Sequence, residues 1–325
     1  MPVTKEFRSI NNQIIILKNR NLKFRNVQRA EEILQKYNYF DVINGFETIL
    51  LDKTPSGTAS VKHYTDVYFE DFKELFFFDM ELKKFTLFKI LDIEARLRTS
   101  IAYHFASVYC STLADTMNYI DPHYYAAPSP TSTHMHNVFT SFDLFRQTQY
   151  YPNGAVKRKS FIDEQKEKKD YIAQYTDPPF WVTIKALPLG TLYYLFIFLD
   201  DVVKEKVLND FGFMLSDANA FTQALYVLKE VRNQCAHLEL ITRFKLKRTA
   251  SVNNLNDITL RAHLSHGPLN YMDVMKIFKL FDGVSDLKNI IIRFYIRMTL
   301  KLRKKIAIKA LSKMGRKSIK EWWKL

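Results

Sequence analysis

The feature that most constrains the fold of this chain is a long stretch, residues 66–110, in which apolar side chains recur every three or four positions. This spacing is that of one face of an α-helix. We expect two long helices or one broken helix here. Only 8 of the 325 residues are glycine, which argues against a glycine-rich α/β nucleotide-binding fold and favours packed helices. The predicted fold class is therefore all-α. The residues that carry the pattern are Phe72, Leu75, Phe76, Met80, Leu87, Leu91 and Ala95.

Prolines and turn-forming residues divide the remainder of the chain. Residues 121–153 contain four prolines with several Ser and Thr, so we expect a loop or a small insertion there. Residues 217–240 repeat apolar side chains at helical spacing and predict a strong helix. We divide the chain into an N-terminal helical region (1–60), a helical core (61–245) and a basic helical C-terminal extension (246–325).

Positive charge is concentrated at the C-terminal end. The formal net charge is +14, and residues 293–325 hold twelve Lys or Arg and one acid, Glu321, which gives +11. Ile296 and Leu300 begin an apolar stripe, so Arg293–Lys324 is predicted to be an amphipathic helix. Three interpretations are open: contact with an RNA backbone, contact with an anionic membrane surface, and a solubilising tail. The candidates for RNA binding are Arg293, Arg297, Lys301, Arg303, Lys304, Lys305, Lys309, Lys313, Arg316 and Lys317.

Composition also bears on location and cofactors. Cys110 and Cys235 are the two cysteines and have no paired spacing, which indicates neither a disulfide framework nor a zinc ribbon and is typical of a cytoplasmic protein. No apolar run approaches the roughly 20 residues of a membrane-spanning helix, so we expect no integral membrane association. Two pairs of histidines, His134 with His136 and His263 with His266, are close in the sequence. They lack neighbouring cysteines or patterned carboxylates, which favours solvated loop histidines over metal ligands. We therefore expect no metal site and no cofactor.

One block, Arg232-Asn233-Gln234-Cys235-Ala236-His237, is the main candidate for chemistry. Its Arg-Asn-x-x-x-His spacing matches the ribonuclease signature of HEPN proteins. Together with other blocks in the same order along the chain, it resembles the AbiD/AbiF-type abortive-infection proteins over roughly residues 5–245. The other blocks are Ala30–Leu34, Tyr37–Phe40, Phe72–Asp79, Ile93–His104, Phe180-Trp181, Gly190–Leu192 and Phe211-Gly212.

The resemblance implies a HEPN-type helical bundle with additional N-terminal and C-terminal helices. It implies a role in bacterial phage defence and the activity of a metal-independent endoribonuclease toxin, with an associated small non-coding RNA in some members. RNA is then the expected partner, as the substrate and, in some members, as a bound structured RNA.

Cleavage of RNA without a metal uses the 2′-hydroxyl as the nucleophile and needs groups that transfer protons and stabilise charge on phosphorus. His237 suits the proton transfers because histidine exchanges protons near neutral pH. Arg232 suits the stabilisation of charge on phosphorus, since its guanidinium group fits two phosphate oxygens. Asn233 lies four residues before His237, so on a helix both share a face. Arg232 lies about 140° from His237 around an ideal helix, so a second motif is expected to complete the site.

A possible second motif combines Glu94, Arg98 and His104. The Arg-to-His spacing falls within the looser HEPN pattern, and Glu94 could hold Arg98 by an ion pair. Such a pair is also an ordinary helix contact, and a lone histidine in an apolar stretch is more often a core or interface residue. We therefore favour the catalytic interpretation for His237 and a structural one for Glu94–Arg98. The active site is then expected across a homodimer or a higher assembly, with a site inside one chain as the alternative.

Three functions are compatible with these patterns. The leading one is an RNA-binding phage-defence protein that acts as a metal-independent endoribonuclease. The second is a non-catalytic RNA-binding module, in which the same Arg and His only bind a partner RNA. The third is a membrane-surface effector that uses the basic amphipathic helix.

Overall fold

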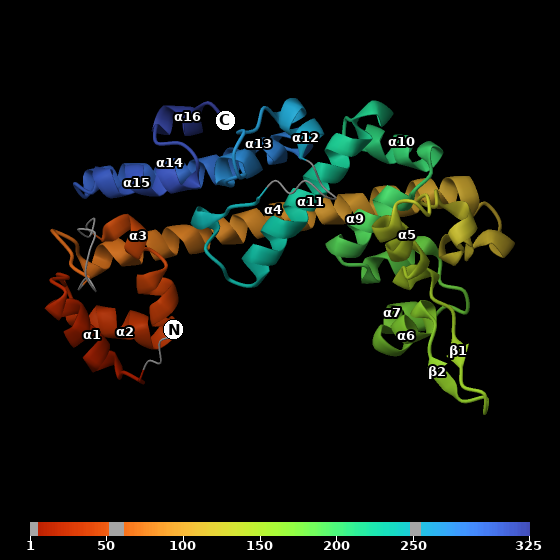
Figure 1. Ribbon diagram of the computed structural model, residues 1–325, viewed down its shortest axis with the longest axis horizontal. Coiled ribbons are helices and arrows are strands. Elements are labelled where there is room, and N and C mark those ends of the chain that lie inside the picture. Colours follow the sequence, from red (N-terminus) through yellow and green to blue (C-terminus); the bar gives the residue numbers. More distant parts are fainter. Residues whose placement is uncertain (1–5, 52–61, 248–254) are drawn as a thin grey trace. The chain divides into compact units, whose positions relative to one another are not determined.

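The computed structural model describes residues 6–51, 62–247 and 255–325. Helices dominate these residues, whose strands form a single antiparallel hairpin, so the fold is all-α as predicted (Figure 1). None of the described helices is both long and apolar enough to cross a membrane. The domain boundaries drawn from the sequence near residues 60 and 245 stay predictions. The described residues form two compact units, unit 1 (up to 88, with 231–247 and 265–325) and unit 2 (89–230, with 255–264).

Unit 1 contains the first part of the long helix α4 (Phe69–Tyr109), the end of α11 (Ala218–Ala236) and most of the terminal helices. Its other elements are α1 (Ile10–Asn19), α2 (Val27–Lys36), the π-helical turn η1 (Phe40–Asn44), α3 (Glu47–Leu50), the 3₁₀ turn η8 (Ile241–Arg243), α13 (Tyr271–Phe281), α14 (Ser285–Leu300), α15 (Lys304–Met314) and α16 (Ile319–Trp323).

The helix α4 is continuous, where the sequence led us to expect two helices or a broken one. Its buried face includes Phe72 and Leu75, as predicted, but Met80 and Leu91 are 37% and 42% exposed. The reason is geometric, because residues spaced by four advance about 40° beyond a full turn at each step. A stripe with this spacing therefore leaves the buried face. The residues that continue that face are Leu82, Ile90, Ile93, Leu97 and Ile101.

The basic C-terminal segment is three helices and not the single amphipathic helix expected from the sequence. The helical conformation is interrupted between α14 and α15, where Leu302 takes a left-handed conformation with φ of 58°. Ile296 and Leu300 are 49% and 79% exposed, so the predicted apolar stripe is wrong at its start. The buried apolar side chains of this segment belong to the core of unit 1, and they are Phe294, Met298, Ala307, Ala310, Leu311, Met314 and Trp322.

Helix α14 packs antiparallel to the first part of α4. The rings of Phe78 and Phe294 stack with their centroids 3.9 Å apart. Ion pairs flank the stacked rings: Arg297 Nε lies 2.8 Å from a carboxylate oxygen of Glu74, and Arg293 pairs with Glu81 at 2.9 Å. The order of these pairs along the two helices establishes their opposite directions.

Unit 2 contains the remainder of α4 and most of α11, with shorter helices around them. Its other elements are the 3₁₀ turns η2 (Leu113–Asp115), η3 (Asn118–Ile120), η4 (Pro122–Tyr124), η5 (Asp143–Phe145), η6 (Ile184–Ala186) and η7 (Leu215–Asp217), the helices α5 (Thr133–Thr140), α6 (Phe161–Lys168), α7 (Asp170–Ala173), α8 (Phe180–Thr183), α9 (Leu189–Phe198), α10 (Asp201–Asp210) and α12 (Asn256–Ala262), and the strands β1 (Gln149–Tyr150) and β2 (Val156–Arg158).

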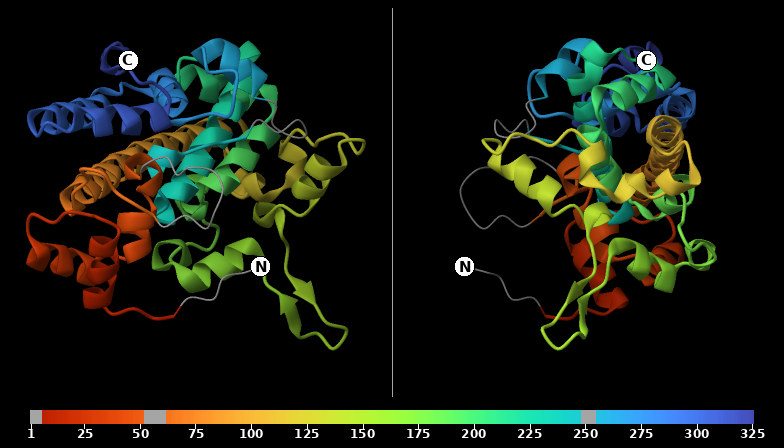
Figure 2. Two further views of the ribbon diagram at one scale, coloured as in Figure 1. Left: turned by 60° about the vertical axis from the view of Figure 1, so that its left-hand side comes forward. Right: turned by 90° about the vertical axis from the view of Figure 1, so that its right-hand side faces the viewer.

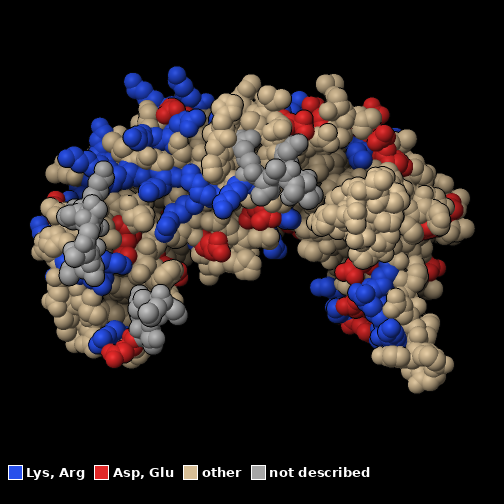
Figure 3. Space-filling view, in the orientation of Figure 1, with Lys and Arg blue, Asp and Glu red and all other residues tan. Residues whose placement is uncertain are grey.

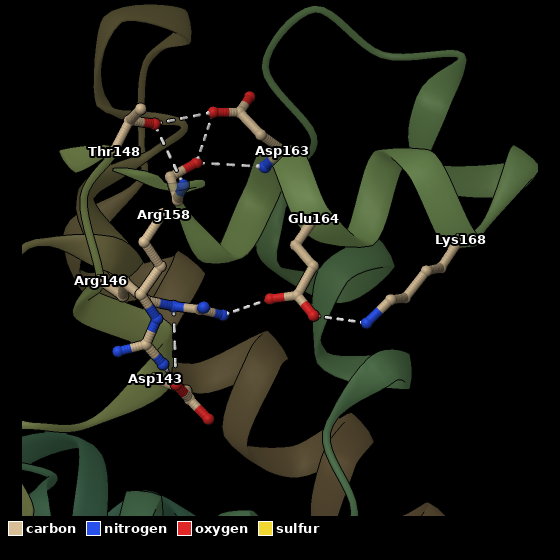
Figure 4. Close-up of polar contacts among 8 residues, drawn as sticks. Asp143, Arg146, Thr148, Arg158, Asp163, Glu164 and Lys168 are labelled. Carbon is tan, nitrogen blue, oxygen red and sulfur yellow. Dashed lines mark hydrogen bonds and ion pairs between the residues drawn. The ribbon is translucent and has the colours of Figure 1, made fainter. Parts of the chain in front are cut away.

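The proline-rich region 121–153 is a small insertion with structure of its own, containing α5, two 3₁₀ turns and β1. The hairpin β1–β2 extends away from the helices of its unit (Figure 2). Its base is held by polar contacts to α6, shown in Figure 4. Arg146 Nη2 donates to Glu164 at 2.5 Å. Thr148 Oγ1 donates to Asp163 at 3.1 Å. These contacts supply support that a lone two-stranded hairpin lacks.

Candidate functional site

The Arg-Asn-x-x-x-His block forms the last turn of α11 and the turn that follows it. The helix ends at Ala236, so His237 lies one residue beyond it. The backbone N–H of His237 still donates to the carbonyl of Asn233 at 2.9 Å, which preserves the helical spacing between these two residues. Leu238 then takes a left-handed conformation with φ of 60°, and this reverses the chain, as at many helix C-termini.

Side chains from α4 and α11, the buried Lys83 and the half-buried Gln234, hold this turn in place. Lys83 Nζ donates to the carbonyl of Leu238 at 2.9 Å. Gln234 Nε2 donates to the carbonyl of Leu240 at 2.8 Å. The left-handed Leu238 costs a non-glycine residue about 1 kcal/mol, and these hydrogen bonds offset that cost. The turn that carries His237 is therefore fixed by side chains on both of its sides.

A buried carboxylate completes the support. Asp79 accepts hydrogen bonds from the backbone N–H and the Oγ1 of Thr242, at 2.8 and 2.7 Å. Lys83 Nζ lies 3.3 Å from its other oxygen. Burial raises the pKa of Asp79, while the nearby Lys83 acts in the opposite direction. This role of Asp79 and Lys83 was not predicted from the sequence. The signal was an oppositely charged pair four residues apart on an otherwise apolar helix face.

The three side chains proposed for chemistry are not used in this support. Within the described part of the chain, the side chains of Arg232, Asn233 and His237 have no hydrogen bond or ion pair. His237 is exposed, whereas Arg232 and Asn233 are half-buried. The Arg232 Nε atom is buried without a hydrogen-bond partner, which is costly for a charged group. All three side chains are thus available to a ligand.

Cys235 lies inside the block but is not available for chemistry. Its side chain is 2% exposed. Burial raises the pKa of its thiol to about 12, with the charge of Asp79 acting in the same direction. Because the thiolate is the reactive form, a thiol with this pKa is unreactive at neutral pH. Cys235 packs as a small apolar residue.

In the possible second motif, Arg98 is engaged by its neighbours in unit 2. It forms an ion pair with the buried Glu94. Its Nε and Nη2 both donate to the carbonyl of Leu187, at 3.1 and 2.9 Å. Leu187 follows the end of η6, so these hydrogen bonds connect the segment between η6 and α9 to α4. The contacts of Glu94 and Arg98 are those of a structural ion pair.

His104 faces a different partner from Arg98. Its Nε2 lies 2.9 Å from an oxygen of Asp210, at the end of α10. Ser100 Oγ donates to the same oxygen at 2.7 Å. Asp210 was not predicted from the sequence, because it lies far from His104 along the chain. A catalytic role for this block stays a prediction. It lies in unit 2, whereas the Arg232–His237 block lies in unit 1.

Lys and Arg gather over the C-terminal helices of unit 1 (Figure 3). Five of the ten RNA-binding candidates are paired with acids: Arg293 with Glu81, Arg297 and Lys301 with Glu74, Arg303 with Asp66 and Asp71, and Arg316 with Glu321. Lys309 donates to the carbonyl of Ile49 at 3.2 Å. Lys304, Lys305, Lys313 and Lys317 have no hydrogen bond or ion pair to any described residue.

A groove with a volume of about 700 Å³ lies between the start of α15 and α3 in unit 1. Its basic lining residues are Arg303, Lys304, Lys305 and Lys309, and Asp66 is the single acid among the described residues that line it. This groove gathers cations from a short segment of one helix and leaves two of them unpaired.

Among the described residues, no three His, Cys, Asp or Glu side chains lie close enough together to hold a metal ion. A family model described as Abi-like protein matches residues 32–241. The match begins in α2 and ends in η8, so it spans both candidate motifs and stops before α12 to α16. No curated protein and no solved structure matches the chain.

Proposed function

Because the chain belongs to the Abi-like protein family, we propose that it is an RNA-binding phage-defence protein whose Arg232, Asn233 and His237 form a HEPN-type endoribonuclease site. The basic helices α14 and α15 bind the RNA backbone. A small structured RNA is a further expected ligand, on the strength of the family resemblance. The alternative is a non-catalytic protein in which the same residues bind RNA without cutting it. A cleavage assay distinguishes the two.

One observation carries this proposal. The turn after α11 is held by Lys83, Gln234 and Asp79, yet the side chains of Arg232 and His237 take no part in holding it. A structure that fixes a backbone turn and leaves its Arg and His side chains free suits a site that binds an external group. Rigid support of this kind is what positions catalytic groups.

The chemistry follows from the three side chains. His237 takes the proton of the 2′-hydroxyl or gives a proton to the departing 5′-oxygen. Arg232 donates to the phosphate oxygens and stabilises charge that develops on phosphorus. Asn233 holds a phosphate oxygen or the imidazole. A second copy of the motif completes each site, so that the His237 of one copy acts together with the Arg232 of the other. None of the three side chains is a carboxylate, so the block by itself has no ligand set for Mg²⁺.

The test is cleavage of RNA by the full-length protein in the presence of EDTA. We expect cleavage to continue and the new 5′ fragment to end in a 2′,3′-cyclic phosphate or a 3′-phosphate. RNA in which the 2′-hydroxyl is methylated should not be cut, since its nucleophile is blocked. Complete loss of cleavage in EDTA, restored by Mg²⁺, would overturn the proposed chemistry. Binding without any cleavage would favour the non-catalytic alternative.

RNA binding by the C-terminal helices is proposed for the lysines that the fold leaves unpaired. Lys304, Lys305, Lys313 and Lys317 can contact phosphates without breaking an ion pair. The paired arginines of α14 would first have to leave Glu74 or Glu81. We therefore assign the larger part of the binding to α15 and to the turn after it.

A further inference from the structure

Unit 2 contains a slot that the proposed catalytic and basic sites do not use. It has a volume of about 720 Å³ and lies between the second part of α4 and the segment α8–η6. Clefts of this size are typical of small-molecule sites. Its floor is formed by small residues of α4, including Ala102 and Ala106. Such a floor admits a flat group close to the helix.

The walls of the slot combine exposed aromatic rings with positive charge. Trp181 and Tyr103 line it and are 58% and 67% exposed. Lys185 and Arg98 also line it, and none of its described lining residues is an acid. Arg98 is neutralised by Glu94, whereas Lys185 lies over the ring of Tyr171 at 4.9 Å and has no ion pair among the described residues. The lining is apolar along its length and cationic through Lys185.

We propose that this slot holds a base of single-stranded RNA, stacked on Trp181, with an adjacent phosphate on Lys185. A nucleobase is flat and apolar on its faces, and its phosphate is an anion that matches the lining. Base stacking on aromatic side chains is sequence-tolerant, because every base has a π-face. The proposal rests on the proposed function, in that it names single-stranded RNA as the form of the ligand. It adds a binding site in unit 2 to the catalytic turn in unit 1.

The experiment measures binding of a fluorescent eight-nucleotide 2′-O-methyl oligoadenylate to the full chain. This probe lacks the free 2′-hydroxyl, so the measurement does not depend on cleavage. Trp181→Ala should weaken binding about tenfold or more, and Trp181→Phe should restore most of the affinity, because stacking contributes on this order. The matched control is Trp323→Ala, whose side chain in α16 is 62% exposed and lies outside the slot. Lys185→Gln should flatten the salt dependence by about 0.7 in slope, the value for one phosphate of a single strand.

Equal affinities for Trp181→Ala and Trp323→Ala would overturn the proposal, as would a wild-type chain that does not bind the probe. If Trp181→Ala instead changed the size of the assembly while keeping its affinity, the slot would hold a second copy of the chain. Thermal unfolding checks that each variant folds. Failure of the proposed function is seen separately: a wild type that binds the probe through Trp181 but never cleaves RNA retains the slot and loses the ribonuclease assignment.

Discussion

At the scale of single residues, Lys83 supports the turn that follows α11 through two contacts. Its ammonium group joins the Leu238 carbonyl to the carboxylate of Asp79. Replacing Lys83 with Met should lower the free energy of unfolding by about 3 kcal/mol, the typical loss when one partner of a buried ion pair is removed. It should also slow RNA cleavage, because the turn carrying His237 loses a tether. The control is Lys84→Met, since Lys84 is the exposed neighbour on α4.

The loss of unfolding free energy in Lys83→Met should be larger at neutral pH than at acidic pH. Burial raises the pKa of Asp79 in the folded chain, and Lys83 counteracts that rise. A raised folded pKa means that stability falls as the pH rises above the unfolded value of about 4. Without Lys83 the pKa rises further, so the loss should be largest at neutral pH and shrink toward pH 4. Urea unfolding at several pH values measures it. A loss that grew on acidification would contradict this assignment.

Cys235 gives a second prediction at this scale. Its thiol has a pKa raised to about 12 by burial, so almost no thiolate exists at pH 8. Iodoacetamide should therefore leave Cys235 unmodified in the folded chain and modify it in urea, as followed by mass spectrometry. Cys235→Ala should keep cleavage within about twofold, since it removes one buried sulfur atom and no reacting group. A large loss of cleavage in a well-folded Cys235→Ala protein would point to a direct role.

At the scale of elements, the arginines of α14 are paired with acids, whereas Lys304 and Lys305 at the start of α15 are unpaired among the described residues. The double variant Lys304→Gln/Lys305→Gln should weaken binding of an RNA hairpin and lower the salt slope by about 0.9 for each lost phosphate contact. The control, Lys169→Gln/Lys206→Gln, removes the same charge from exposed positions in unit 2. Binding is measured by fluorescence polarisation between low and moderate salt. If both doubles changed the slope equally, net charge and not α15 would explain the binding.

The same helices show where inference from sequence stops. The charge of residues 293–325 was evident from composition, but its acidic partners Glu74 and Glu81 lie on α4, far away in the sequence. Local periodicity could not identify them. The break at Leu302 was equally hidden, because a left-handed conformation at a leucine has no sequence signal comparable to glycine or proline.

At the scale of the whole molecule, the fold class and the Abi-like family could be predicted, because long helical periodicity and ordered short motifs are both properties of the sequence. The support of the candidate site could not. Asp79, Lys83 and Thr242 meet only after folding, and the contact between His104 and Asp210 has the same character. The position of His237 beyond the end of α11 also required the structure.

Assembly is the prediction that belongs to the molecule as a whole. One copy of the motif presents Arg232 and His237 about 140° apart around an ideal helix, so we expect two copies to meet across a two-fold axis. Arg232→Ala and His237→Ala should each be inactive alone. When the two variants are mixed in equal amounts and exchange subunits, about half of the dimers should contain one chain of each kind. Each such mixed dimer holds one intact site of two, so the mixture should recover about a quarter of the wild-type rate.

The mixing experiment is read together with sizing. Exchange of differently tagged chains shows whether mixed dimers form. Mixed dimers without any recovery of cleavage would contradict a site shared between chains. If His104→Ala were as inactive as His237→Ala in a protein that stays monomeric, the site would instead lie within one chain, with the Glu94–Arg98–His104 block as the second motif.

The central claim is that His237 transfers a proton in RNA cleavage, and one comparison tests it most directly. Purified His237→Ala and His134→Ala proteins are assayed on the same RNA in EDTA, with circular dichroism and thermal unfolding as checks of the fold. His134 is an exposed histidine on α5 without a hydrogen bond or ion pair among the described residues. We predict that His237→Ala loses cleavage at least about a hundredfold and also loses toxicity in cells, while His134→Ala retains both. A folded His237→Ala protein that cut RNA at the wild-type rate would contradict the account.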